Sequence, residues 1–401
     1  MKASKKNLLF RIFLAALAVT LFIIPDSVTS PEIEQRVIAS VLGVDKADGI
    51  YKVTAQVVVP KRAGEGDPAQ DVVSAEGKSV PEGIDKLNRA LGRNIELGHC
   101  GVIVIGDTAG ADFLDYLLAG SILTTGTYLV NAADASQFIE SVKGMSTSTI
   151  TGLDGYINFS TASANTSTKQ LLQFVSETAS PSRTSYVPSL EADSGDGGKN
   201  GSGESRPASA GGGSGGQSAG GKSSEEGTPT IKSAEKTAIY VDSVKVGVFG
   251  EKETRGLAWL DKQATRGYVS LENFEADGQS MGGVYAQLKS KSSKLQPYFK
   301  DGRPFVKVRI RANLILDDKH KLHLFATKTG ENAAVSAMEE AFEALIREEI
   351  GAGMIKATEL KADPFGIKTA FYRYSYDRYG SVDGEGFSDV RVEYDVDVKV
   401  N

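Results

Sequence analysis

A run of about 40 residues rich in glycine and serine interrupts an otherwise ordinary globular sequence, from Ser189 to Thr228. Its central part reads SGDGGKNGSGESRPASAGGGSGGQSAGGKSSEEG and contains almost no side chain that a core could bury. Ordering such a segment would cost conformational entropy that apolar burial does not offset. We therefore predict a disordered linker over residues 189–230, either between two domains or as a long loop inserted into one folded unit.

The first thirty residues are a second segment that stands apart from the folded protein. Basic residues precede an apolar run from Ile12 to Ile24, an order typical of a secretory signal or a short signal anchor. Val28 and Ser30 have the spacing of a cleavage site, but Pro31 would follow the cut. Residues 1–30 are therefore interpreted as a signal peptide or an N-terminal membrane anchor, with a buried helix as the alternative. Export would place the remainder of the chain on the extracytoplasmic face of a membrane.

Composition disfavours several classes of function. A length of 401 residues suits two or three domains, and a net charge of -6 with thinly spread lysine and arginine argues against a nucleic-acid binder. Cys100 is the only cysteine, so neither an intramolecular disulfide nor an all-cysteine metal site can form. Three histidines (His99, His320 and His323) leave little material for a zinc site or a histidine-based triad. We therefore predict no cofactor and no enzymatic activity.

Hydrophobic periodicity before the linker predicts an α/β domain over residues 31–145. Expected strands cover residues 37–44 and 51–59, joined as a hairpin by the Asp45–Gly49 turn, and residues 127–131. Residues 101–106 form a short apolar run bounded by glycines, which indicates a buried central strand. Expected helices lie around residues 84–91, 113–118 and 138–142. Residues 146–188 are rich in serine and threonine, with one apolar helical patch from Leu171 to Val175. We interpret this part as a connecting region.

A second domain is predicted over residues 231–401. Asp242–Ser243 lies between two short apolar runs and indicates a hairpin, and the alternating sequences of residues 306–314 and 390–400 indicate strands. Apolar residues between Val335 and Ile346 repeat at helical spacing, which predicts a helix of about four or five turns. We expect an antiparallel sheet backed by this helix. The predicted fold class is α+β, with mixed and antiparallel sheets packed with helices in two or three domains.

Four stretches, taken in order, resemble the Ger(x)C family of spore germination proteins. They are EIEQRVIASVLGVDKADGIYKVTAQVVVP, DVVSAEGKSVPEGIDKLNRALGRNIELGHCGVIVIGD, IYVDSVKVGVFGEKETRGLAWL and ADPFGIKTAFYRY. The resemblance implies several small sheets packed with helices. It also implies a non-catalytic subunit of a nutrient germinant receptor, acting by protein–protein contact beside two integral-membrane subunits in the inner spore membrane.

One departure from the family pattern concerns membrane attachment. Members of this family are typically lipoproteins, whereas no cysteine follows the apolar run here. An uncleaved N-terminal helix would then have to attach the chain to the membrane; the alternative is a diverged relative with another role. Two alternative functions remain open, namely a secreted cell-wall hydrolase and a structural envelope protein of the same fold.

Several residues invite a chemical interpretation, but a structural one is favoured for each, so we assign no catalytic, cofactor or metal residue. His99 and Cys100 are adjacent on an expected strand and should face opposite sides, with Cys100 buried and His99 in a structural hydrogen bond. His320 and His323 lie beside an expected turn. Asp395 and Asp397 share one face of the last strand, where paired carboxylates suit calcium but simple solvation or a cross-strand charge pair is expected.

Two further segments have a structural and a functional interpretation. Asp363–Gly366 (DPFG) is expected to end a helix and form a turn, with an interaction loop as the alternative. Gly106 and Gly110 lack the lysine and hydroxyl residue that complete a phosphate-binding loop. The aromatic residues from Phe371 to Tyr379 are expected to pack in the core, although some rings could contact a partner subunit.

Overall fold

The structure is a computed structural model, and it describes most of the chain outside the N-terminal segment and the predicted linker. The described residues are 36–59, 69–120, 122–143, 153–161, 166–193, 230–317, 319–325 and 327–401, with Phe10, Phe13, Leu14 and Leu17. Predictions for residues 1–30 and 194–229 otherwise lie outside this part. Within it, no helix combines the length and the apolar character needed to cross a bilayer. The α+β class is confirmed.

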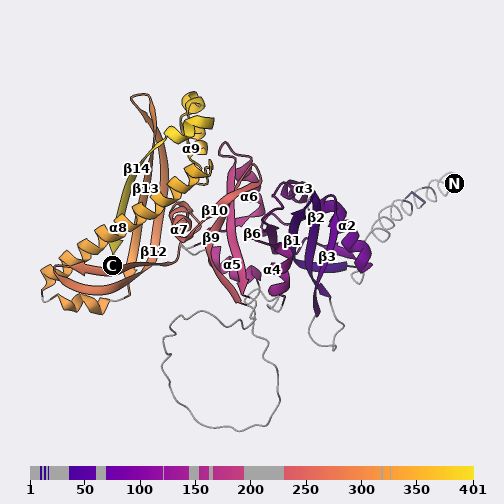
Figure 1. The fold of residues 1–401 in the computed structure, drawn as a ribbon, viewed down its shortest axis with the longest axis horizontal. Coiled ribbons are helices and arrows are strands. Elements are labelled where there is room, and N and C mark those ends of the chain that lie inside the picture. Colours follow the sequence, from indigo (N-terminus) through magenta and orange to yellow (C-terminus); the bar gives the residue numbers. More distant parts are fainter. Residues whose placement is uncertain are drawn as a thin grey trace, which may run out of the picture.

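Ten strands form one mixed sheet, ordered β10-β9-β8-β6-β5-β1-β2-β3, with β4 beside β1 and β7 beside β6 (Figure 1). The four central strands β8, β6, β5 and β1 are parallel to one another, whereas β2 and β3 on one side and β9 and β10 on the other pair antiparallel. The strands are β1 (Arg36–Ala47), β2 (Ile50–Val59), β3 (Ala69–Gly77), β4 (Asn94–Glu96), β5 (Val102–Gly106), β6 (Tyr128–Ala132), β7 (Lys169–Gln170), β8 (Thr184–Asp193), β9 (Thr230–Val241) and β10 (Val244–Phe249).

Helices cover both faces of this sheet. Residues from α2, α3 and α6 share a core with one face, and residues from α4 and α5 share a core with the other. All five residues of β5 are buried, because this parallel strand is covered on both sides; the uninterrupted apolar run had indicated this. The helices are α2 (Val80–Leu91), α3 (Phe113–Ala119), α4 (Ala135–Ser141), α5 (Leu153–Thr161) and α6 (Leu171–Thr178).

The predicted boundaries around the linker are wrong at both ends. Glu191, Ala192 and Asp193 pair with Lys232, Ile231 and Thr230, so the strands continue into the stretch assigned to the linker. β8 and β9 are neighbours in one sheet, so residues 194–229 join two strands of a single folded unit instead of separating two domains. Residues 166–188 are likewise not a connecting region, since β7 and the first half of β8 belong to the same sheet and α6 packs against it.

The second sheet has four strands, ordered β11-β12-β13-β14. β14 pairs with β13 in parallel, so this sheet is mixed and the antiparallel prediction is wrong there. A parallel pair needs a crossover connection, and the long helix α8 carries the chain about 48 Å back across the sheet between β13 and β14. The elements are α7 (Glu251–Leu260), β11 (Tyr268–Ala276), β12 (Gln279–Lys300), β13 (Arg303–Leu316), η2 (Lys319–Leu324), α8 (Lys328–Glu359), α9 (Ile367–Tyr374), η3 (Tyr376–Ser381), η4 (Gly384–Asp389) and β14 (Arg391–Val400).

At 32 residues, α8 is about twice as long as predicted. Its C-terminal half contains glycine and was not recognised as helical from apolar spacing. Apolar residues remain buried there, such as Ile350 and Met354, but Gly353 among them lies against the ring of Phe365 and against the backbone of α7. Close packing at this glycine therefore adds to the apolar stripe in this part of the helix.

Two-residue turns connect four pairs of adjacent strands. Asp48–Gly49, Asp242–Ser243, Asp277–Gly278 and Asp301–Gly302 all have positive φ at both positions. This is the conformation of the tight hairpin turns that match the twist of the flanking strands. The first two turns confirm predicted hairpins. The other two join β11 to β12 and β12 to β13, which the sequence analysis had not recognised.

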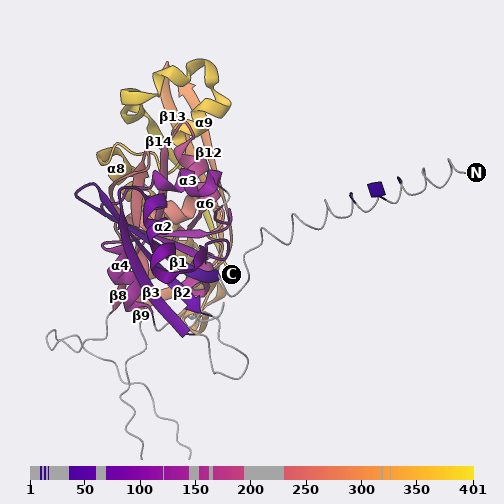
Figure 2. The ribbon, with the colours of Figure 1, turned by 90° about the vertical axis from the view of Figure 1, so that its right-hand side faces the viewer.

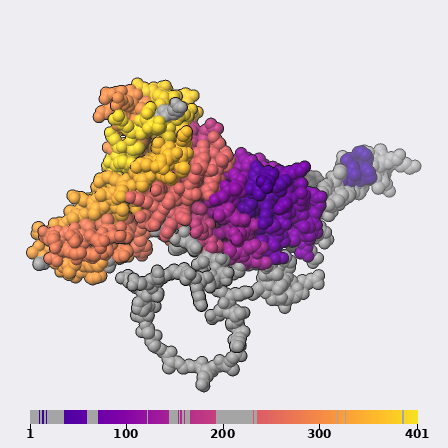
Figure 3. Space-filling view, in the orientation of Figure 1, coloured from indigo at the N-terminus to yellow at the C-terminus, as the bar shows by residue number. Residues whose placement is uncertain are grey.

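Strands β8 to β10 join the two parts of the molecule. Val187, Ala238 and Tyr240 face the core of the large sheet, whereas the alternate residues Tyr186 and Ile239 face the core of the four-stranded sheet. The body is elongated, with β1–β3 at one end and β11–β14 at the other (Figures 1 and 3), and Figure 2 shows α9 beside the tips of β12 and β13.

The crossing of α7 and α8 depends on Gly256. A Cβ atom at this position would lie 2.2 Å from the carbonyl oxygen of Glu349 in α8. We expect Gly256→Ala to lower the free energy of unfolding by about 1–3 kcal/mol, because the two backbones must separate. The matched control is Gly351→Ala in α8, where the nearest atom is 3.6 Å away and removal of a helical glycine should stabilise by up to about 1 kcal/mol. Equal urea-denaturation midpoints for the two variants would contradict the prediction.

Candidate functional site

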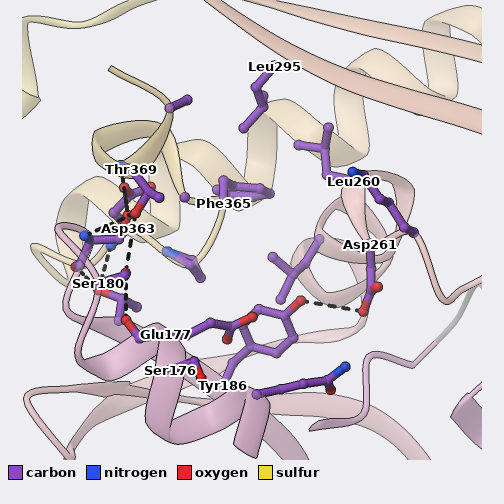
Figure 4. A pocket seen from close by; sticks show the side chains of 18 of the residues that line it. Ser176, Glu177, Ser180, Tyr186, Leu260, Asp261, Leu295, Asp363, Phe365 and Thr369 are labelled. Carbon is purple, nitrogen blue, oxygen red and sulfur yellow. Dashed lines mark hydrogen bonds between the residues drawn. The ribbon is translucent and has the colours of Figure 1, made fainter. Parts of the chain in front are cut away.

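A cleft of about 780 Å³ lies where the large sheet meets the four-stranded sheet (Figure 4). We call it the junction cleft. Its walls come from α6 and β8 on one side and from the end of α7, the middle of β12 and the start of α9 on the other. Charged residues that line it include Lys169, Glu177, Asp261, Asp363 and Arg373.

The first wall is held by a buried charged network. Lys169 Nζ lies 2.7 Å from Glu177 Oε1 and 4.2 Å from the centre of the Tyr186 ring. Ser185 donates a hydrogen bond to the other oxygen of Glu177 at 2.7 Å, and the Tyr186 hydroxyl donates to Asp261 at 3.4 Å. The network therefore ties β7, α6 and β8 to the end of α7.

Burial and the neighbouring polar groups together determine the protonation states in this network. It raises the pKa of the Tyr186 hydroxyl above its ordinary value, so this group stays neutral at physiological pH. Burial by itself would lower the pKa of Lys169, but the nearby oxygens of Tyr186, Glu177 and Asp261 outweigh it and raise that pKa. Lys169 is therefore a permanent cation whose charge is already satisfied within the protein.

Asp363 forms the centre of the second wall. Its carboxylate accepts hydrogen bonds from the backbone N–H groups of Ile367 (2.9 Å) and Lys368 (2.7 Å), which begin α9. The Ser182 hydroxyl donates to the same carboxylate at 2.7 Å, and the Asp363 N–H donates to Thr184 Oγ1 at 3.0 Å. One buried side chain thus caps α9 and binds it to the segment that leads into β8.

Hydroxyl groups extend this contact across the junction. Thr369 Oγ1 in α9 lies 2.8 Å from Ser182 Oγ and 3.2 Å from Ser180 Oγ, and the Thr369 N–H donates to Ser182 Oγ at 3.2 Å. The DPFG segment forms a turn in which Gly366 has a φ of +74°. The predicted turn is confirmed. Its aspartate also makes an interdomain contact that the turn alone did not imply.

The α7 side of the cleft is fixed by two buried ionisable groups from other elements. Lys291 in β12 donates to the carbonyl oxygens of Trp259 (3.1 Å) and Asp261 (2.7 Å) and so satisfies the end of α7; burial lowers its pKa to about 8. Glu349 in α8 accepts from Trp259 Nε1 at 2.7 Å and lies 2.9 Å from Arg255 Nε. Burial raises the pKa of Glu349 above its ordinary value.

A group of exposed tyrosines lies beside the cleft. Phe371 is fully buried, but Tyr372, Tyr374 and Tyr376 expose 43%, 70% and 68% of their surface, and Tyr374 lines the cleft. Tyr372 makes an edge-to-face contact with Tyr376, with the ring centres 5.1 Å apart. We call these three residues the tyrosine ridge. The aromatic run therefore divides between the core and the surface, as the two interpretations of the sequence allowed.

The cysteine and the three histidines considered in the sequence lie apart from the cleft. Cys100 is buried, its thiol donates to the Val102 carbonyl at 3.2 Å, and burial raises its pKa to about 12. The predicted buried role of Cys100 is confirmed, whereas His99 is exposed at the rim of a separate small cavity. His320 and His323 are exposed in η2. Among the described residues, no group of three or more histidine, cysteine, aspartate or glutamate side chains is arranged to hold a metal ion.

The carboxylates of the last strand form the charge pairs that were predicted. Asp395 lies 2.8 Å from Arg311, 3.0 Å from Arg309 and 3.3 Å from Lys307. Hydrogen bonds from the two arginines lower its pKa to about 2. Asp397 lies 3.2 Å from Arg311. Both carboxylates are therefore occupied by cations of the neighbouring strand.

The sequence analysis missed the residues that build the junction. Ser182, Thr184 and Glu177 fall in the stretch interpreted as a Ser/Thr-rich connecting region. Its hydroxyl content was a usable signal, because short polar side chains commonly cap helices and bind backbone groups at turns. Asp261 had no local signal, since its place depends on the packing of α7 against the second sheet.

Asp363 should make stability depend on pH. Burial raises its pKa to about 6 from an ordinary value of 3.8, so between these values the folded protein binds more protons than the unfolded chain. Its contribution to the free energy of unfolding therefore falls as the pH rises through this window, by about 1.4 kcal/mol per pH unit. Asp363→Asn keeps a neutral group of the same shape, so its stability relative to the unmodified protein should increase from pH 4 to pH 6.

Chemical denaturation across this pH range measures the effect. The control is Asp115→Asn at an exposed position of α3, which reports removal of a carboxyl group away from the junction. A difference between Asp363→Asn and the unmodified protein that did not change with pH would contradict the raised pKa.

Comparison with known proteins gives matches along nearly the whole chain. A family model described as spore germination protein N-terminal domain matches residues 29–192, and one described as spore germination B3/GerAC like, C-terminal, matches residues 235–401. The chain is 21% identical over 398 residues to spore germination protein KC of Bacillus subtilis (strain 168), covering 95% of this chain and 91% of that protein. The crystal structure of the GerBC protein is similar in fold, with a TM-score of 0.50 and 15% identity, covering 90% of this chain and 96% of that chain.

Proposed function

Because the chain belongs to the Ger(x)C family of spore germination proteins, we propose that it is a non-catalytic, extracytoplasmic subunit of a nutrient germinant receptor. In this proposal it acts by protein–protein contact with integral-membrane subunits of the receptor. The observation that carries the proposal is the tyrosine ridge, an exposed aromatic group on an element that is bonded to both parts of the molecule.

The composition of the ridge suits a protein interface. Tyrosine is enriched where proteins meet, because its ring supplies apolar area and its hydroxyl supplies a hydrogen bond. Tyr374 at the end of α9 and Tyr376 at the start of η3 expose more than two thirds of their surface, although Phe371 of α9 is fully buried. A partner that covers the ridge would remove this exposed aromatic surface from water.

The anchoring of α9 gives such a contact a mechanical consequence. The first turn of α9 is held by Asp363, whose other bond goes to Ser182 beside the large sheet. A partner that moved the ridge would therefore load the hydrogen bonds across the junction. The chain would then transmit a movement between its two parts without converting a substrate.

Membrane attachment in this proposal is by the N-terminal segment. Phe10, Phe13, Leu14 and Leu17 are helical and expose between 45% and 64% of their surface. Their exposure favours a lipid-contacting role over the buried-helix alternative, since apolar residues of a buried helix would be covered by the protein. The membrane to which the chain is attached in this proposal is the inner membrane of the spore.

Removal of the gene for this chain should impair germination with the nutrients that its receptor recognises. The tagged chain should also co-purify with multi-span membrane proteins from dormant-spore membranes. Normal germination of the deletion strain, together with an absence of such partners, would overturn the proposal. Release of the chain into the cytosolic fraction would overturn its placement at the membrane.

The ridge itself is tested by Tyr374→Ala combined with Tyr376→Ala. Because truncation of a central interface tyrosine typically costs more than about 1 kcal/mol, we expect at least roughly tenfold weaker recovery of the membrane partners. The matched control is Tyr268→Ala with Tyr285→Ala, two tyrosines of the second sheet that are 55% and 52% exposed. Equal recovery with both double variants, at unchanged thermal stability, would remove the ridge from the interface.

A further inference from the structure

The four-stranded sheet has two chemically different faces. Alternate residues of β13, such as Val306, Val308 and Ile310, are buried in a core shared with α7, α8 and α9. The residues between them point to the opposite side, and each pairs with an outward residue of β12 and β14. We call this side the basic face.

Positive charge predominates on the basic face, although the whole chain has a net charge of -6. Three carboxylates at the paired outward positions are outnumbered by eight basic side chains. The basic residues are Lys294, Lys300, Arg303, Lys307, Arg309, Arg311, Arg391 and Lys399, and the acidic ones are Glu393, Asp395 and Asp397. This positively charged face is complementary to an anionic surface, even though the chain as a whole is negatively charged.

Asp395 holds the centre of this face in a defined arrangement. Its carboxylate is within 3.3 Å of the charged groups of Lys307, Arg309 and Arg311, which keeps three cations close together despite their repulsion. The side chains of Arg309 and Arg311 remain 41% exposed, whereas that of Asp395 is 24% exposed. The cations are therefore positioned in advance and remain partly exposed to solvent.

We propose that the basic face binds the anionic headgroups of a phospholipid bilayer. Neighbouring strands are about 4.8 Å apart and outward residues repeat about every 6.8 Å along a strand, so the cations form a planar array. Such an array matches many headgroups at once. Arginine also binds phosphate groups through paired N–H donors, which lysine does not offer in the same geometry.

The apolar content of the face favours lipid over a permanent protein partner. Stable protein interfaces have an apolar core in which lysine is depleted, but the centre of this face carries charged, serine and glutamine residues. Its aromatic residues lie at one end, where Tyr298 and Phe305 stack with ring centres 5.4 Å apart. Aromatic rings beside basic residues are typical of the headgroup region of a membrane.

This inference rests on the proposed function in one respect only, which is the placement of the chain beside a membrane. The test needs no other receptor protein. Full-length chain is mixed with vesicles of phosphatidylcholine alone and with vesicles in which phosphatidylglycerol replaces part of it, and binding is measured by flotation. The N-terminal segment is present in both cases, so the increase caused by phosphatidylglycerol is the quantity of interest.

Phosphatidylglycerol should increase binding of the unmodified chain, and added salt should reduce the increase. Arg309→Gln with Arg311→Gln should weaken this component about 25-fold, since each basic residue near an anionic surface contributes about fivefold. Lys294→Gln with Lys300→Gln, at two exposed positions of β12, should weaken the phosphatidylglycerol-dependent binding by a similar factor. This second variant shows whether the loss in the first one is caused by misfolding. Arg309→Lys with Arg311→Lys should retain most of the increase.

The matched control is Lys78→Gln with Arg93→Gln, which removes two exposed cations from the large-sheet part of the molecule. An equal loss with this control would mean that net charge alone determines binding, and would overturn the proposal. Binding of the unmodified chain that did not depend on phosphatidylglycerol would also overturn it. If, in addition, Arg309→Gln with Arg311→Gln abolished recovery of the multi-span proteins, the face would belong to a protein partner; the receptor assignment itself would stand.

Discussion

Burial of both faces of β8 and β9 is the constraint on which the rest of the structure depends. Tyr186 and Ile239 belong to one core, and Val187 and Tyr240 belong to the other, so neither core is complete without these strands. The link from β8 to the rest of the large sheet is narrow, since Asn131 and Ser189 are the one registered pair between β6 and β8. Side chains reinforce it: Asn131 donates to the Tyr240 hydroxyl and accepts from Lys245. Polar side chains thus bridge the place where the backbone ladder is weakest.

The junction cleft follows from this arrangement. Because β8 continues from the turn at Ser180–Ser182, that turn is held in place by two cores, and α9 can be bonded to it through Asp363. The same aspartate caps the helix that presents the tyrosine ridge. A burial-raised pKa at this point means that the bond between the two parts has a cost when the carboxylate is ionised. The strength of this contact therefore depends on the protonation state of Asp363.

Elements with a local cause were predictable from the sequence. The run VIVIG indicated a strand buried on both faces, and the alternation at residues 390–400 indicated a strand with one charged face; both are present. The sequences ADGQS and KDGRP contain the same Asp-Gly signal as the recognised first hairpin, and their hairpins were missed because β12 is too polar to read as a strand. The length of α8, the parallel addition of β14 and the place of Asp261 depend on contacts between distant segments, which periodicity does not contain.

The tyrosine ridge and the basic face lie on different sides of the second sheet. α9 packs on the apolar side, where Phe371 contacts Phe299 with ring centres 5.4 Å apart, and it carries the tyrosine ridge. The arginines of β13 point to the other side, away from Val308 and Ile310 of the core. A contact on one side therefore leaves the other side free, and both are connected through the same rigid strands. In the two proposals made above, the chain would rest against lipid through charge, which salt weakens, and would hold a protein partner through aromatic contact, which salt affects much less.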